Sequence, residues 1–302
     1  MEHTLATSAD GSNTLQLTRF NETYHSRNGA FTEATHIYIR CGLEHLFEKR
    51  LQRGFETSVH RGFETSAGNP THTVGICART IPPVGINIYD IGLGTALNCI
   101  LTWCWQQQLI RSGLPHPQIA YYGIEKYPIP PQEALQMNYP QVIAGHMGIL
   151  PDSNLPDSSL STGCNSPGST PERKCILHTE EISSAFKKIH TCEWEKDVEI
   201  TPGFTLHKSC ADISLLQENY YSAGKYSSSP AMIFYDTFSP ATQPELWDGS
   251  IFRAIASGCA PGSILTTYCS KGTVKQALRN AGFNLERLSG PPGKRHILRG
   301  VL

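Results

Sequence analysis

The feature that most constrains this chain is the stretch 86–98, where an apolar strand runs into a glycine-rich turn and then a helix. Its β-branched isoleucines predict a short buried strand that ends near Asp90. Gly92 and Gly94 permit a tight turn and a close approach of the backbone to a ligand. The apolar residues that follow predict a helix whose first amides face the same crevice. This order of elements predicts a nucleotide-binding cradle.

The spacing of the glycines indicates which nucleotide would bind. A dinucleotide fold requires Gly-x-Gly-x-x-Gly. The pattern here is Asp90-x-Gly92-x-Gly94-x-Ala96, which fits the acidic-x-Gly-x-Gly-x-Gly pattern of S-adenosylmethionine (AdoMet) methyltransferases with alanine in the last place. AdoMet has no phosphate and needs carboxylates for its ribose hydroxyls and its amino group. On the motif alone, an ordinary tight turn is an equally good interpretation.

Composition restricts the class of protein further. The 302 residues suit one large α/β domain with insertions or two small ones, and 39% hydrophobic residues suit a globular core. We see no apolar run that could span a bilayer and no targeting leader, so we expect no membrane association. Ten cysteines without CxxC pairs argue against a zinc ribbon and a compact disulfide framework. We therefore expect no metal and a reducing, cytoplasmic compartment.

Charge is unevenly distributed along the chain. From residue 271 onward there are seven Lys and Arg against one acid; the totals of 25 and 26 then leave 18 basic and 25 acidic side chains before it. Such a split predicts a basic face that docks on a polyanion, although a solvated surface helix and hairpin would look the same. The seven are Lys271, Lys275, Arg279, Arg287, Lys294, Arg295 and Arg299.

Three acids stand at the ends of predicted strands. Glu125 ends the second strand beside the cradle, where a carboxylate can accept hydrogen bonds from both ribose hydroxyls. Asp212 follows a later strand and would either hold an adenine amino group or cap the next helix. Asp236 follows the apolar residues 231–235, at the edge where open α/β sheets place their chemistry. Phe238 then forms an aromatic lip beside it.

The order of the predicted elements gives the fold class. Parallel βα units are followed by a closing hairpin of residues 283–288 and 296–299. We expect an α/β fold of the Rossmann-like, class I AdoMet-dependent methyltransferase type. It would have a mostly parallel seven-stranded sheet and a C-terminal antiparallel hairpin.

We expect residues 1–302 to form a single domain with three irregular parts. Residues 1–13 are predicted to be loose, and an N-terminal flap (about 10–35) would cover the cofactor. A duplicated surface loop (53–68) repeats Arg-Gly-Phe-Glu-Thr-Ser, and a Ser- and Pro-rich stretch (about 150–175) is predicted to be a flexible insertion.

Several motifs together resemble one family. They are Asn21-Glu-Thr-Tyr-His-Ser26, the 90–98 cradle, Tyr235-Asp-Thr-Phe-Ser-Pro240 with Pro244-Glu-Leu-Trp247, and Gly290-Pro-Pro-Gly-Lys-Arg295. Over residues 10–300 the chain resembles the methyltransferase half of the bifunctional tRNA 5-methylaminomethyl-2-thiouridine biosynthesis proteins (MnmC) and their stand-alone MnmD-like relatives. The flavin-dependent half of those proteins has no counterpart here, so an FAD-dependent oxidase would be a separate partner.

The resemblance implies an AdoMet-dependent N-methyltransferase acting on tRNA. The reaction would convert 5-aminomethyl-(2-thio)uridine at the wobble position to 5-methylaminomethyl-(2-thio)uridine. Asp236 would orient the substrate amine and accept its proton, and Phe238 would stack on the base. The residues implied to bind AdoMet are Tyr24, Asp90, Gly92, Gly94, Asn98, Glu125 and Asp212, and those implied to bind tRNA are Lys271, Lys275, Lys294 and Arg295.

Other interpretations remain open on the sequence alone. Asp236 would otherwise cap a helix, Phe238 would belong to the core, and Lys294 and Arg295 would only solubilise a turn. A methyltransferase of the same fold could act on a small-molecule or protein amine, and a relative without catalysis could bind nucleic acid. A nucleotide-dependent dehydrogenase is disfavoured by the missing third glycine.

Overall fold

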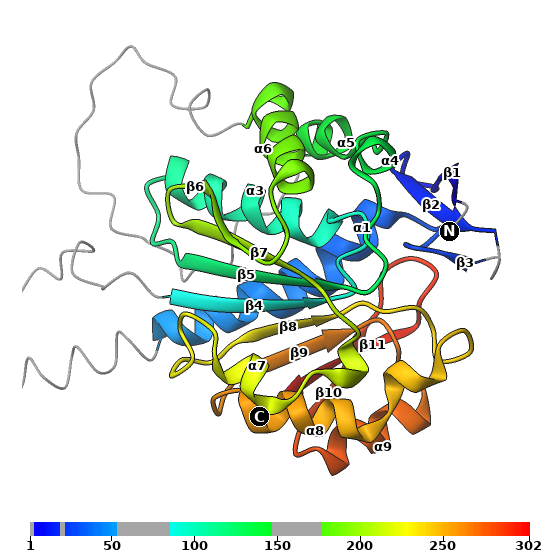
Figure 1. Cartoon of the computed structure of the whole chain (residues 1–302), viewed down its shortest axis with the longest axis vertical. Coiled ribbons are helices and arrows are strands. Elements are labelled where there is room, and N and C mark those ends of the chain that lie inside the picture. The colour runs from blue at the N-terminus through cyan, green and yellow to red at the C-terminus, as the bar shows by residue number, and fades with distance from the viewer. Residues whose placement is uncertain (1–2, 19–21, 53–84, 147–176) are drawn as a thin grey trace, which may run out of the picture.

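The structure is a computed structural model that describes residues 3–18, 22–52, 85–146 and 177–302 (Figure 1). Its centre is an eight-stranded sheet of strand order β10-β11-β9-β8-β4-β5-β7-β6, in which the five strands from β9 to β7 run parallel. The strands are β4 (Gly85–Ile91), β5 (Gln118–Glu125), β6 (Asp197–Thr201), β7 (Phe204–Cys210), β8 (Met232–Tyr235), β9 (Ile264–Thr267), β10 (Asn284–Ser289) and β11 (His296–Val301).

The predicted α/β fold with a C-terminal antiparallel hairpin is confirmed, with one strand more than the seven expected. β10 and β11 pair antiparallel, and β11 also pairs antiparallel with β9. The additional strand is β6, which pairs antiparallel with β7 at the edge of the sheet. Its sequence Asp-Val-Glu-Ile-Thr lacks the apolar run by which the other strands can be found, because an edge strand buries little of its surface.

Helices cover both faces of the sheet (Figure 1). One face carries α1 (Ala30–Ala34), its π-type continuation η1 (Thr35–Glu44), α3 (Leu97–Arg111), α5 (Tyr139–His146) and α6 (Thr179–Thr191), with the short α4 (Pro131–Ala134) nearby. The other face carries α7 (Glu218–Ser222), α8 (Gly249–Gly258) and α9 (Gly272–Asn280). Two single turns of 3-10 helix, η4 (Ile213–Leu215) and η5 (Pro244–Trp247), complete the connections.

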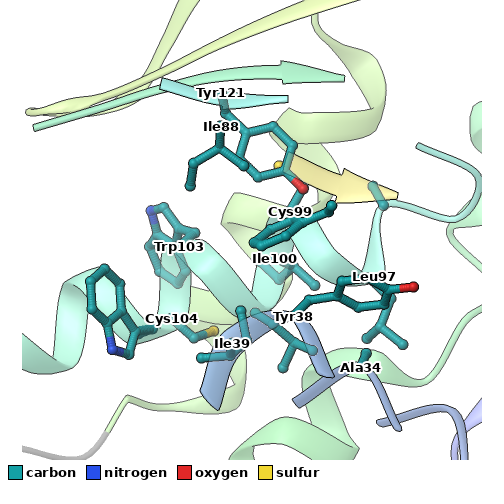
Figure 2. Close-up of a cluster of buried hydrophobic side chains, with 14 of the residues drawn as sticks. Ala34, Tyr38, Ile39, Ile88, Leu97, Cys99, Ile100, Trp103, Cys104 and Tyr121 are labelled. Atoms are coloured by element: carbon teal, nitrogen blue, oxygen red, sulfur yellow. The ribbon is translucent and has the colours of Figure 1, made fainter. Parts of the chain in front are cut away.

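The side chains of β4 show how the sheet divides the core. Successive residues of a strand point to opposite faces, so Ile88 packs in one hydrophobic cluster and Tyr89 in the other. Figure 2 shows the first cluster, in which Ile88 of β4 lies beside Tyr121 of β5 and to which Ile100 of α3 and Tyr38 of η1 also belong. By the same alternation Asp90 faces this first cluster. That direction decides what the Asp90 carboxylate can reach.

A small three-stranded sheet of β1 (His3–Thr7), β2 (Asn13–Leu17) and β3 (Glu22–Thr23) lies near the carboxyl ends of the parallel strands (Figure 1). The prediction that residues 1–13 are loose is wrong for the described part, because β1 pairs with β2 along its whole length. The duplicated loop (53–68) and the insertion (150–175) lie outside the described residues.

Within the described ranges no helix is long and apolar enough to cross a membrane. In the same part of the chain, no group of three or more His, Cys, Asp or Glu side chains is placed to hold a metal ion.

Candidate functional site

A cavity opens at the carboxyl edge of the parallel strands. The ends of β4, β5, β7 and β8 contribute to it, as does the segment after β3. Parallel strands end at a common edge, so the three acids predicted from their strand-end positions meet here. The predicted residues that line the cavity are Tyr24, Gly92, Gly94, Glu125, Asp212, Asp236 and Phe238.

The turn after β4 needs glycine at two positions. At Gly92, φ is +92° and a Cβ atom would lie 2.5 Å from the backbone oxygen of Asp236. At Gly94, φ is +48° and a Cβ atom would lie 2.9 Å from Cδ1 of Tyr24. Ala96 takes the place of the third glycine with φ +56°, a left-handed conformation. The turn therefore brings the Asp236 loop and the Tyr24 ring against the cradle.

Glu125 connects the end of β5 to the cradle. Its carboxylate accepts hydrogen bonds from the backbone N–H of Gly94 (3.0 Å) and of Tyr127 (2.9 Å). Burial raises the pKa of this carboxyl, and the backbone donors oppose the rise. The side chain still lines the cavity, where its oxygens are available to hydroxyl groups of a ligand.

Asp212 both caps a helix and lines the cavity. Its Oδ1 accepts from the backbone N–H of Ser214 at the start of η4 (3.0 Å), as the capping interpretation predicts. Its Oδ2 lies 2.7 Å from Nζ of Lys126. The hydrogen bond from Lys126 is the main reason why the pKa of Asp212 is lowered. Asp212 is therefore a charged group at the cavity wall.

Asp236 directly follows β8, and its backbone N–H donates to the carbonyl of Ile91 (3.0 Å). Its Oδ2 accepts a hydrogen bond from Nδ2 of Asn98 (3.0 Å). Burial raises the pKa of Asp236 to about 6, against the lowering by Tyr38, Asn98 and Lys294. A carboxylate with this pKa is charged at neutral pH and is a better proton acceptor than an ordinary aspartate.

Asp90 and Asn98 do not line the cavity, contrary to the prediction that they contact the cofactor. Asp90 is fully buried below the turn, where its Oδ2 accepts from the hydroxyl of Tyr121 (2.5 Å). Asn98, also buried, donates to Asp236. The alternation of β4 points Asp90 into the core, so these two residues support the site from beneath.

Two aromatic rings form the lip of the cavity. Tyr24 and Phe238 lie edge to face with ring centroids 5.1 Å apart, and the hydroxyl of Tyr24 is 3.4 Å from Nε2 of His3. Glu22 in β3 accepts a hydrogen bond from the backbone N–H of Ser239 (3.2 Å). The N-terminal sheet is thereby attached to the loop that carries Asp236 and Phe238.

The four predicted RNA-binding residues separate into two environments. Lys294 points inward, with Nζ 2.6 Å from Oε2 of Glu33. Lys271 and Arg295 are exposed, and Lys275 is half-buried on α9. The pKa of His296 is lowered by desolvation and then by Arg287, Arg295 and Lys275. We call the last three residues the basic cluster.

Three site residues were missed by the sequence interpretation. Lys126 pairs with Asp212, Tyr38 interacts with Asp236, and Glu33 pairs with Lys294. The sequence around Glu33 gives no sign that this residue is buried. Tyr38 reads as a core aromatic on a helix face, and its partner lies on a distant strand.

Residues 180–302 match the model of a family described as S-adenosyl-L-methionine-dependent methyltransferase. The crystal structure of MnmC2 from Aquifex aeolicus superposes with a TM-score of 0.57 at 18% identity, over 100% of this chain and 71% of that one. The chain has the fold of an AdoMet-dependent methyltransferase. This fold and the matched family imply AdoMet as the cofactor.

Curated relatives confirm the resemblance found from the motifs. The bifunctional tRNA 5-methylaminomethyl-2-thiouridine biosynthesis protein MnmC of Nitrosospira multiformis is 23% identical over 221 residues, which are 73% of this chain and 29% of that protein. The MnmC of Stutzerimonas stutzeri is 44% identical over 69 residues, 23% of this chain and 10% of that protein. The matches thus span less than a third of these bifunctional relatives.

The residues of the cavity fit AdoMet. At Gly92 and Gly94 the space that a Cβ atom would need is taken by Asp236 and Tyr24, so both residues lie against the turn at the cavity. Glu125 offers a carboxylate of the kind that ribose hydroxyls need, and Asp212, after the neighbouring strand β7, offers a second. Carboxylates bind hydroxyl and amino groups and would repel a phosphate. Two acids at the cavity therefore agree with AdoMet, which has no phosphate.

Proposed function

We propose that this methyltransferase acts on tRNA, and that it converts 5-aminomethyl-(2-thio)uridine at the wobble position to the 5-methylaminomethyl form. The observation that carries the proposal is the position of Asp236, whose backbone lies against Gly92 and which lines the cavity together with Phe238. The nature of the substrate is inferred from the relatives' names, which describe biosynthesis of this modified uridine in tRNA.

The residues suit methylation of an amine. Bound AdoMet would supply an electrophilic methyl group, and Tyr24, Gly92, Gly94, Glu125 and Asp212 would hold the cofactor. An alkylammonium has no lone pair and must lose a proton before it can attack. Asp236, which is negatively charged at neutral pH, would attract the ammonium, orient its nitrogen and accept the proton. Holding the nitrogen in line with the methyl group is the larger part of such catalysis.

The base and the tRNA backbone would be bound by different parts of the molecule. Phe238 at the lip would stack on the uracil ring, a contact that contributes about 1–3 kcal/mol in single-stranded nucleic acid recognition. Lys271 and the basic cluster lie outside the cavity and would contact phosphates. The aminomethyl substrate would be supplied by a separate FAD-dependent oxidase in a cytoplasmic setting.

The decisive assay is methyl transfer to tRNA that carries 5-aminomethyl-2-thiouridine, with the nucleosides analysed by mass spectrometry. We expect Asp236→Ala to lower kcat at least about a hundredfold, because the amine loses its orienting group and base. AdoMet affinity, measured by calorimetry, should stay within a few fold of the unmodified protein.

Three results would count against this assignment. Normal AdoMet binding without transfer to that nucleoside would leave a methyltransferase of another amine. Absence of AdoMet binding would point to a relative without catalysis. Equal loss of turnover and cofactor affinity in Asp236→Ala would make Asp236 a cofactor ligand.

A further inference from the structure

We propose that Lys294 and Glu33 are positioning residues for Asp236, and that the ion pair between them controls the charge that Asp236 presents to the substrate amine. This inference rests on the proposed function, in which Asp236 receives that amine. It reassigns Lys294, which the sequence placed among the RNA contacts, to an ion pair beside the site.

Lys294 is held by two contacts that leave little of it exposed. Its Nζ lies 2.6 Å from Oε2 of Glu33, and the side chains of the two residues are 26% and 11% exposed. The same Nζ lies 5.0 Å from the centre of the Tyr268 ring, within the range of a cation–π contact. The hydroxyl of Tyr268 donates to the carbonyl of Thr237 (2.9 Å), which is the residue after Asp236. Lys294 is therefore connected to the Asp236 loop.

The turn that carries Lys294 is packed tightly against the N-terminal segment. A Cβ atom on Gly293, where φ is +86°, would lie 2.0 Å from Nδ2 of Asn28. His36 in η1 makes a hydrogen bond to the carbonyl of Ser289 (2.8 Å). These contacts fix the position of the Lys294 backbone relative to Glu33. A lysine that served only to contact RNA would need no such packing.

Several titratable groups surround Asp236, and the Lys294–Glu33 ion pair is the one that we expect to affect its charge. The titratable groups that interact with Asp236 among the described residues are Tyr38, Lys294, Glu33, Asp90, Tyr121, Tyr139 and Tyr268. Burial raises the pKa of each of these tyrosines, so their hydroxyls stay uncharged where Asp236 titrates. Burial also raises the pKa of Asp90 and of Glu33.

Lys294 and Glu33 act on Asp236 in opposite directions. The ammonium of Lys294 favours the charged form of Asp236, whereas Glu33 and Asp236 disfavour each other's charge. Replacing Lys294 by a neutral residue should therefore raise the pH at which Asp236 ionises. Replacing Glu33 by a neutral residue should lower the pH at which Asp236 ionises. It would also leave Lys294 without the carboxylate that competes with Asp236 for its charge.

The test is the acid limb of the pH profile of kcat/KM for Lys294→Met, Glu33→Gln and Lys294→Arg. We expect the midpoint of the limb to move up by about one pH unit in Lys294→Met, so that the rate at pH 6 falls several fold to tenfold. In Glu33→Gln the midpoint should move down. Lys294→Arg, which keeps the charge, should stay near the unmodified protein.

Midpoints that shift in opposite directions distinguish control of the Asp236 charge from a general loosening of the site. Loosening would move the midpoint of Lys294→Met and that of Glu33→Gln in the same direction. Shifts in the same direction would overturn the inference. So would an unmoved limb in Lys294→Met with a raised KM for tRNA and a weaker salt dependence, which is the signature of a phosphate contact. Arg295 is the next residue in the chain and is exposed. Arg295→Ala should show the raised KM and weaker salt dependence of a lost phosphate contact, and it serves as the comparison.

A second readout does not need the tRNA substrate. The carboxyl carbon of Asp236, labelled with 13C and assigned by its loss in Asp236→Asn, can be titrated by NMR in the free protein. The same opposite shifts are expected there. If they appear while the unmodified protein fails to methylate tRNA, the proposed function fails and the role of the ion pair stands. If wild-type activity is normal and the titration does not respond, the ion pair has no such role.

Discussion

At the scale of single residues, the carboxylate of Asp236 lies in surroundings that disfavour its own charge. Asn98 donates to it, yet burial still raises its pKa from 3.8 to about 6. A raised pKa in the folded state means that the fold is stabilised by the protonated form. This contribution is complete below pH 3.8 and is lost as the pH rises through about 6. At neutral pH the ionised Asp236 therefore lowers the free energy of unfolding.

We predict that Asp236→Asn stabilises the protein at neutral pH although it impairs transfer. An uncharged amide of the same shape avoids the cost of burying a charge, so the free energy of unfolding should rise by about 1–3 kcal/mol at pH 8. Urea titrations at pH 8 and at pH 4 measure it. At pH 4 the two proteins should differ little, and an equal gain at both values would exclude ionisation as the cause.

The same residue should set the lower pH limit of the reaction. Protonated Asp236 can neither attract an ammonium nor accept its proton, so kcat/KM should rise about tenfold per pH unit below 6 and level off above it. A pH–rate profile from 5 to 8, at constant ionic strength, measures this. A profile that is flat over this range would mean that Asp236 titrates as an exposed aspartate does.

At the scale of elements, the turn between β4 and α3 is the least replaceable part of the site. We predict that Gly92→Ala destabilises the fold more than Gly94→Ala, by more than about 2 kcal/mol against about 1 kcal/mol. The Cβ at Gly92 meets backbone of the Asp236 segment, which cannot yield, whereas at Gly94 it meets a tyrosine ring that can turn away. Denaturant midpoints of the two variants decide the order.

The activity of these variants should follow a different order. Gly94→Ala pushes on Tyr24, so AdoMet affinity should fall even where stability is nearly kept. Adding Tyr24→Ala removes the ring contact, so relative to Tyr24→Ala the double variant should keep only the cost of the left-handed backbone at position 94. If the double variant stays as unstable as Gly94→Ala, backbone strain rather than the ring is responsible.

The strands explain which parts of the site could be predicted. Glu125, Asp212 and Asp236 were found because parallel strands end at one edge, so a strand-end acid is placed by topology alone. The pleat of β4 points the Asp90 side chain toward Tyr121 below the turn, and because both faces of this strand are apolar, its sequence does not indicate that direction. The Glu33–Lys294 pair joins segments near opposite ends of the chain, and no periodic pattern reports such a contact.

At the scale of the whole molecule, the basic cluster is the surface that the charge distribution of the sequence predicts. We predict that Arg295→Ala weakens tRNA binding and reduces the slope of log K against log salt by about one. Lys187 on α6, exposed and remote from β10 and β11 in the fold, offers a matched control. Binding isotherms at several salt concentrations measure both. Equal effects of Lys187→Ala and Arg295→Ala would show unspecific attraction.

The position of β11 between β9 and β10 has a consequence for biogenesis. β10 is translated before β11 but can join the sheet only through it, and Lys294 lies in the turn that connects the two. On the ribosome, Glu33 therefore emerges long before its counter-ion, and a nascent chain stalled before β11 should bury this acid without compensation. Pulse proteolysis of stalled chains should find the nucleotide cradle protected only after β11 has left the exit tunnel.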